Sequence, residues 1–181
     1  MAKRALIIVD VQNDFCPGGT LAAKDGDQVV PPLNKLILEF QRTGEPIFKS
    51  RDWHPAITKH FRNFGGIWPV HCVQHTRGAE FHPDLIDSDS ITIISKGLGD
   101  EDRYSAFDGT ELEALLRELG VEELVIGGLA TDHCVKHTVL AGLEHGFKVK
   151  VVNEAMRAVE LEPGDGERAI EEMKAAGAEI V

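Results

Sequence analysis

Short apolar runs alternate with longer amphipathic stretches along the whole chain. The apolar runs are rich in valine and isoleucine, and they predict strands at residues 5–9, 46–50, 91–95, 124–127, 149–152 and 179–181. These runs carry few polar side chains on either face, which is typical of a parallel sheet covered by helices on both sides.

The stretches between the runs predict helices. Apolar residues recur at helical spacing over residues 29–40, 112–119 and 135–143, and again near Ile170 and Met173. The glycines that separate these stretches from the next run are Gly44, Gly120, Gly146 and Gly177. Glycine is favoured where a helix ends in a left-handed residue. Repeated helix–glycine–strand passages indicate right-handed crossovers. We therefore predict one domain over residues 1–181, a three-layer α/β/α fold with a six-stranded, mostly parallel sheet.

Residues 51–89 break this alternation, because they contain no convincing long element. Five of the eight histidines fall within them. The aromatic residues of the segment, expected to be buried, are Trp53, Phe61, Phe64, Trp68 and Phe81. Long irregular segments in compact domains tend to be functional or disordered, and the aromatic content favours a functional site.

The charge of the chain excludes one class of function. Its 181 residues include 19 basic and 30 acidic ones, giving a formal net charge of −11, which argues against electrostatic binding of nucleic acid. No apolar run approaches the roughly 18 residues of a membrane span, and the first residues lack a signal-peptide pattern. The widely spaced Cys16, Cys72 and Cys134 suit free thiols in a reducing compartment. We expect a cytoplasmic protein with neither a nucleic-acid nor a membrane partner.

Cys134 is the strongest candidate for a reactive side chain. It follows the apolar run 124–126 and the glycines of residues 127–128, and it precedes an amphipathic stretch. This pattern places it in the first turn of a helix, just past the carboxyl end of a buried strand. Helix N-termini favour both a thiolate and an oxyanion. The alternative is a small core residue, which is the usual role of a free cysteine.

Asp10 and Lys96 also follow predicted strands. A carboxylate at the end of a buried strand loses solvent, so its pKa rises and it becomes a better base for a thiol. Each residue has an ordinary alternative, a capping aspartate and an exposed lysine. If their strands are neighbours of the strand before Cys134, the three side chains meet.

A second group of residues favours a metal ion. Asp52 and His54 stand two positions apart, so an extended backbone can direct both side chains to one side. With His60 and His71 they form a donor set that suits Zn²⁺, Fe²⁺ or Mn²⁺. A histidine-rich surface loop is the alternative.

Aromatic residues lie close to both groups in the sequence. Phe15, Trp68 and Tyr104 could stack against a flat ring, or they could pack in the core. His133 and His137 flank the cysteine, as part of a polar pocket wall or as residues on a helix face.

Several motifs occur in a fixed order over the chain, at residues 9–15, 17–19, 51–55, 68–73, 96–97, 104–107 and 127–135. In this ordered set the chain resembles the nicotinamidases (pyrazinamidases) of the isochorismatase-like cysteine hydrolase superfamily. The resemblance implies the isochorismatase-like hydrolase fold, and it implies a catalytic triad of Asp10, Lys96 and Cys134. It also implies an oxyanion hole made by the backbone N–H groups of Ala130 and Cys134, and a cis peptide bond between Leu129 and Ala130.

The same resemblance implies one divalent metal ion. Asp52, His54 and His71 match the family's ligands, and His60 matches a fourth ligand that only some members have. Zn²⁺ is the expected metal, with Fe²⁺ or Mn²⁺ as alternatives. The residues matching the family's substrate pocket are Phe15, Trp68, Tyr104, Leu129 and His137.

The implied reaction is hydrolysis of nicotinamide to nicotinate and ammonia through a Cys134 thioester, in pyridine nucleotide salvage. Pyrazinamide would give pyrazinoate in the same way. The expected partner is this small substrate, bound by a monomer or a homodimer. The alternatives are a superfamily hydrolase acting on another amide or an enol ether, and a non-catalytic α/β ligand-binding protein.

Overall fold

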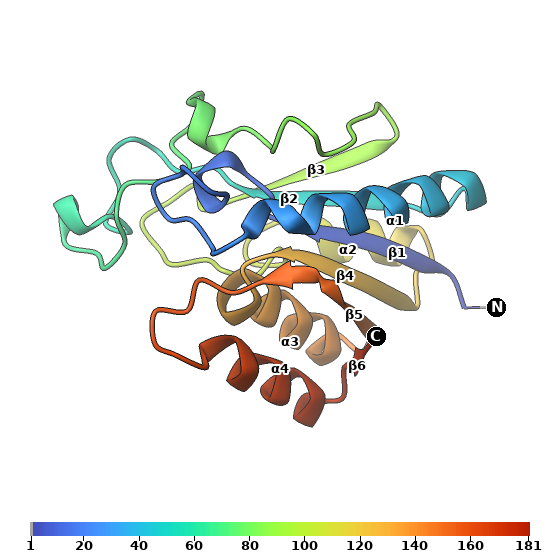
Figure 1. Cartoon of the computed structure of the whole chain (residues 1–181). Helices are drawn as coiled ribbons and strands as arrows, with labels where there is room; N and C mark the ends of the chain where they lie inside the picture. The colour runs from blue at the N-terminus through green and yellow to red at the C-terminus, as the bar shows by residue number, and fades with distance from the viewer. Residues whose placement is uncertain (1) are drawn as a thin grey trace.

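A six-stranded sheet forms the centre of the computed structural model, which describes residues 2–181 (Figure 1). Its strands are β1 (Arg4–Val9), β2 (Ile47–Asp52), β3 (Ile91–Lys96), β4 (Glu123–Leu129), β5 (Lys148–Arg157) and β6 (Glu179–Ile180). Their order across the sheet is β3-β2-β1-β4-β5-β6, and each neighbouring pair is parallel. The predicted six-stranded sheet is confirmed.

Helices cover both faces of the sheet. They are α1 (Val30–Thr43), α2 (Leu112–Glu118), α3 (Lys136–Glu144) and α4 (Asp165–Ala176). Leu6 and Ile8 of β1 pack in the apolar cluster of α1, whereas Ile7 belongs to the cluster of α2, α3 and α4. Successive strand residues point to opposite faces, so this alternation builds the predicted three layers.

The glycines expected at helix ends have the backbone conformation that this role requires. Gly44 follows α1 with φ of 71°, and Gly177 follows α4 with φ of 110°. β5 extends beyond the predicted residues 149–152, because a register shift in its pairing with β4 lets Met156 pair opposite Gly128. A pattern of apolar residues does not reveal this continuation.

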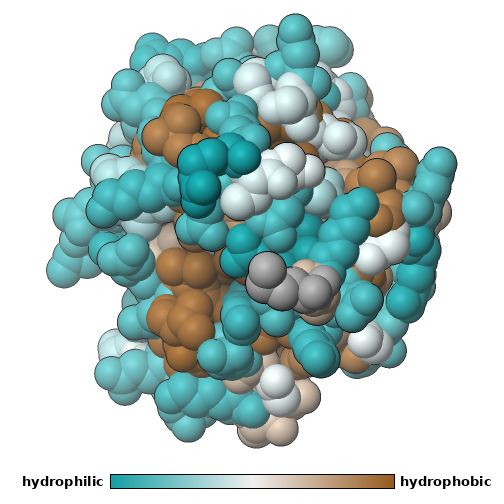
Figure 2. Space-filling view, turned by 90° about the vertical axis from the view of Figure 1, so that its right-hand side faces the viewer, coloured by the Kyte–Doolittle hydropathy of each residue, from teal (hydrophilic) through white to brown (hydrophobic). Residues whose placement is uncertain are grey.

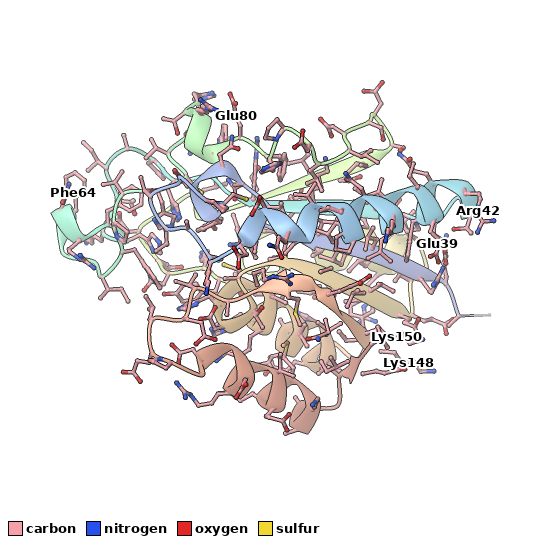
Figure 3. The ribbon with its side chains drawn as sticks, viewed as in Figure 1. Glu39, Arg42, Phe64, Glu80, Lys148 and Lys150 are labelled. Carbon is pink, nitrogen blue, oxygen red and sulfur yellow. The ribbon has the colours of Figure 1, made fainter. Side chains whose placement is uncertain are left out.

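The segment between β2 and β3 is irregular, as predicted, with short 3-10 turns at Arg62–Phe64 and Arg77–Ala79. Phe61 and Trp68 are buried, but the expected burial of Phe64 is wrong, since 43% of it is exposed. Figure 3 shows Phe64 at the outer tip of this segment, at the opposite end of the molecule from Arg42 of α1.

The two ends of the sheet differ in character. The end at which the strands begin faces the viewer in Figure 2, and it is mostly hydrophilic with separate apolar areas. At the other end the strands lead into the irregular segment and the remaining long loops (Figure 1). Ligands of open α/β sheets bind outside the carboxyl ends of the strands, so we expect the functional site at this end. Within residues 2–181, no helix has the length and apolar character needed to cross a bilayer.

Candidate active site and metal centre

Lys96, the last residue of β3, lies at the centre of a buried cluster of charged side chains. Its Nζ is 2.8 Å from Oδ2 of Asp10 and 2.5 Å from Oδ1 of Asp52. It also donates a hydrogen bond to Sγ of Cys134 at 3.6 Å and to the carbonyl oxygen of Arg103 at 3.4 Å. The structure thus brings together the three residues that the sequence placed at strand ends.

Strand order explains why they meet. Asp10 directly follows β1, and Cys134 lies just beyond β4, which pairs with β1. β3 is two strands away from β1, and the long lysine side chain spans the end of β2. Asp10 has φ of 48°, a left-handed conformation that aspartate tolerates better than most residues. The Ser50 hydroxyl holds its carboxylate by donating to Oδ1 at 2.6 Å.

Burial controls the protonation of this cluster. It raises the pKa of Asp10 above its usual value even though Lys96 acts in the opposite direction. It also raises the pKa of the Cys134 thiol well above its usual value, and the opposing charge of Lys96 does not cancel the effect. Burial alone would lower the pKa of Lys96, but Asp10 and Asp52 outweigh it and raise that pKa well above its usual value. Lys96 is therefore charged at neutral pH, and Cys134 is a thiol that needs a base.

Cys134 lies in a π-helical turn rather than in the first turn of an α-helix. The turn covers Thr131–Val135 between β4 and α3, and the Val135 N–H donates to the Ala130 carbonyl at 3.1 Å. Cys134 therefore lies in the first turn of a helix just past β4, as predicted, and the π-helical form of that turn is the feature that the sequence pattern did not reveal. The peptide between Leu129 and Ala130 is cis, as the family resemblance implies.

Beside Lys96, Asp52 faces a cluster of imidazole rings. Oδ2 of Asp52 is 3.6 Å from Nε2 of His54 and 3.8 Å from Nε2 of His71. One ring nitrogen from each of His54, His60 and His71 lies within 4.8 Å of the others, and all three residues are buried. The structure therefore gathers the four residues that the sequence analysis considered as metal ligands.

Hydrogen bonds fix which nitrogen of each ring can bind a metal. Nδ1 of His54 contacts the carbonyl of Gly97 at 3.0 Å, and Nδ1 of His71 contacts the carbonyl of Pro69 at 2.7 Å. Nδ1 of His60 contacts the Asp102 carboxylate. These oxygens only accept, so each Nδ1 carries the proton and each Nε2 keeps its lone pair.

The donor set fits a divalent metal ion. Among residues 2–181, the buried Nε2 of His54 has no hydrogen-bond partner. Burial lowers the pKa of His71 to about 4 and also lowers the pKa of His60, so both rings are neutral at pH 7, as ligands must be. Imidazole nitrogens with one carboxylate suit Zn²⁺, and they also accommodate Fe²⁺ or Mn²⁺.

A narrow pocket joins the cysteine to the histidine cluster. Its lining residues are Phe15, Leu21, Asp52, His60, Trp68, His71, Arg103, Tyr104, Ala130, His133, Cys134 and Val159. Trp68 and Tyr104 are linked by a hydrogen bond of 2.9 Å from Nε1 to Oη. Trp68 also lies edge-on to His133, with ring centroids 5.1 Å apart. Three of the five expected pocket residues, Phe15, Trp68 and Tyr104, are therefore in the wall.

The other two expected pocket residues lie elsewhere. Leu129 is fully buried in the apolar cluster of α1, because the chain turns at Ala130 and presents that residue to the pocket instead. His137 stacks against Tyr104 with centroids 5.1 Å apart and is not part of the lining.

Sequence reasoning missed several residues of this site. Leu21, Arg103 and Val159 line the pocket from loops, and Asp102 holds His60 from the loop after β3. Val159 follows β5, so a strand-end argument could have found it if the length of β5 had been known. No local pattern marks the others.

Comparisons with known proteins cover nearly the whole chain. The isochorismatase domain family matches residues 4–181. Nicotinamidase of Escherichia coli (strain K12) is 41% identical over 202 residues, covering 99% of this chain and 95% of that protein. Nicotinamidase/pyrazinamidase of Mycobacterium tuberculosis is 36% identical over 186 residues, covering 98% of each. A crystal structure of pyrazinamidase of Pyrococcus horikoshii in complex with zinc has a TM-score of 0.93 and 45% identity, covering 99% of this chain and 98% of that one.

Proposed function

The chain belongs to the isochorismatase family, and we infer from its site that it is a cysteine amidohydrolase that converts nicotinamide to nicotinate and ammonia. Pyrazinamide is the corresponding second substrate, giving pyrazinoate. The observation that carries the proposal is the placement of Asp52 between Lys96 and the histidines, which joins a thiol site and a metal site in one pocket.

The first half of the reaction uses Asp10 as the base. Asp10 takes the proton of the Cys134 thiol, and charged Lys96 stabilises the thiolate at 3.6 Å. The sulfur attacks the carboxamide carbon and forms a C–S bond. We assign the backbone N–H groups of Ala130 and Cys134 to the oxyanion that develops. The C–N bond then breaks, and the proton held by Asp10 passes to the leaving nitrogen, so that ammonia departs and a thioester remains.

The second half repeats this chemistry with water. Asp10 accepts a proton from a water molecule, whose oxygen attacks the thioester carbon. The C–S bond breaks, the proton on Asp10 returns to the Cys134 sulfur, and the product leaves as nicotinate after losing the second proton of the water molecule to solvent. The raised pKa of Asp10 suits both directions of transfer, because a carboxylate of ordinary pKa is a poor base for a thiol.

Asp52, His54 and His71 would hold the metal ion, with His60 as a fourth ligand. When bound, Zn²⁺ supplies a positive centre that can attract the ring nitrogen of a pyridine. Phe15, Trp68 and Tyr104 line the pocket with aromatic surface, which favours a flat ring over an aliphatic amide.

An ammonia-release assay on the purified chain tests the proposal. We expect release from nicotinamide and pyrazinamide, and its loss in Cys134→Ala with zinc still bound. An aliphatic amide of similar size serves as the control for the aromatic pocket, and an enol ether of the isochorismate type tests the alternative reaction. Turnover of the aliphatic amide or enol ether in place of nicotinamide would reject the substrate assignment. Substantial turnover by Cys134→Ala would reject the thioester.

A further inference from the structure

The segment that carries His60 is held by the loop after β3. The Thr58 hydroxyl donates to the Gly99 carbonyl at 2.9 Å, and the Lys59 N–H donates to Oδ1 of Asp100 at 3.0 Å. The third contact joins the Nδ1 of His60 to the carboxylate of Asp102. Three successive residues of one irregular segment, Thr58, Lys59 and His60, thus contact the loop that begins directly after Lys96.

The three histidines of the cluster are held in different ways. His54 and His71 donate from Nδ1 to the backbone carbonyls of Gly97 and Pro69. His60 alone donates to a side chain. A carboxylate carries a full negative charge, so it stabilises an Nδ1–H donor and raises the basicity of the opposite nitrogen more than a neutral carbonyl does.

The Asp102 contact also fixes the direction of the His60 ring. The ring is 4% exposed, and it stacks on His54 with centroids 4.4 Å apart. Its centroid is 5.3 Å from that of His71. With Nδ1 bound to Asp102, the lone pair of Nε2 is the donor available to the cluster.

We propose that Asp102 is a positioning residue that makes His60 a protein ligand of the metal ion. It keeps the proton on Nδ1 and holds the ring turned into the cluster. The inference rests on the proposed metal centre, and it does not depend on which amide is hydrolysed. Because the Asp102 side chain is 47% exposed, its replacement leaves no cavity in the buried core.

The test measures zinc affinity by competition with a chromophoric chelator. We expect Asp102→Ala to weaken zinc binding by roughly 10- to 100-fold, the usual effect of removing a carboxylate that orients a histidine ligand. Asp102→Asn retains an acceptor oxygen without the charge, so we expect it to recover part of that loss. Asp100→Asn is the matched control, since it removes a carboxylate from the same loop that contacts only the segment's backbone and the Lys59 ammonium.

A double-mutant cycle separates a role through His60 from a general loss of structure. We expect Asp102→Ala to have no further effect on zinc affinity in a His60→Ala background. The visible absorption of the Co²⁺-loaded protein should change in the same direction in both single variants, because His60→Ala removes the Nε2 ligand and Asp102→Ala no longer holds it in place. Thermal melting of the metal-free proteins checks that each variant folds.

Several results would overturn the inference. If the wild type binds zinc and Asp102→Ala binds it with unchanged affinity, the role of Asp102 is rejected while the metal centre stands. Additive losses in the cycle reject the route through His60. A wild type that binds no divalent metal rejects the metal centre itself, while ammonia release from nicotinamide still reports separately on the thiol chemistry.

Discussion

Lys96 and Asp52 are joined by a 2.5 Å contact between Nζ and Oδ1, and the second carboxylate oxygen of Asp52 faces the histidine cluster. One carboxylate therefore belongs to both the thiol site and the metal site. Lys96 and the proposed metal ion lie on opposite oxygens of Asp52. Substitutions at the two residues should consequently separate the two functions.

Lys96→Met should lose ammonia release by more than about 100-fold, because the Cys134 thiolate loses its nearby cation. It should keep zinc bound, since Asp52 retains both oxygens and its negative charge is no longer balanced by the lysine. Asp52→Ala should lose both ammonia release and zinc binding. Activity and zinc content, measured on the same samples, check the difference. Zinc loss in Lys96→Met with the fold intact would contradict the proposed division of roles.

Gly97→Ala should weaken the metal site although it replaces no metal ligand. Gly97 has φ of 71°, and a Cβ there would lie 2.6 Å from Cε1 and 2.8 Å from Nδ1 of the His54 ring. The ring must move, so we expect zinc affinity to fall by roughly tenfold or more. Gly99→Ala is the control, because nothing lies within 4 Å of a Cβ at that position. Equal effects in the two variants would reject the steric explanation.

Ser50→Ala should shift the acid limb of the pH–activity profile to higher pH. Burial raises the pKa of Asp10, and the hydrogen bond from Ser50 acts in the opposite direction by stabilising the carboxylate. Without it the pKa of Asp10 rises further, so the base is lost at a higher pH. A bond to a charged group contributes about 1.5–3 kcal/mol, which predicts roughly 10- to 100-fold lower kcat/KM on the acid limb and a near-normal plateau.

Ser95→Ala is the control for that profile. Ser95 lies on the neighbouring strand β3 and accepts a hydrogen bond from Arg51 rather than contacting Asp10. Its acid limb should coincide with that of the wild type. A Ser50→Ala profile that also coincides would show that Asp10 does not set the acid limb.

Asp132→Asn should raise KM more than it lowers kcat. Its two carboxylate oxygens accept the N–H groups of Val159 at 3.0 Å and Glu160 at 2.9 Å, and Val159 lines the pocket. The asparagine amide presents its own N–H group to the backbone N–H of Val159 or Glu160, so one of these hydrogen bonds is lost. The loop that carries Val159 should then leave its position, and KM for nicotinamide should rise by roughly tenfold. Asp165→Asn, which loosens the same loop near Glu162, should leave KM unchanged. An unchanged KM in Asp132→Asn would contradict the link.

The strand ends explain what the sequence could reveal. Apolar runs can be recognised in the sequence alone, and four of the site residues end or follow such a run: Asp10, Asp52, Lys96 and Cys134. Parallel strands then bring the residues to one edge of the sheet.

The pocket wall and the supports of the metal ligands depend on contacts between irregular loops. The His60–Asp102 pair joins residues 42 positions apart, and neither residue lies in a strand or helix. Hydrophobic periodicity carries no information about such a pair. The exposure of Phe64 was missed for the same reason, because an aromatic side chain predicts burial only where packing partners are known.

Because β1 lies between β2 and β4, catalytic activity requires that the strands on both sides of β1 have assembled. Asp10 meets Cys134 only after β4 has paired with β1, and it meets Lys96 only after β2 and β3 have assembled on the other side. Both tryptophans, Trp53 and Trp68, lie in the segment between β2 and β3. Trp53 packs on Arg51 and His75, so its fluorescence during refolding follows the flank of β2 and β3, whereas Trp68 also lies against His133 beyond β4. Returning ammonia release marks the moment at which both flanks are in place.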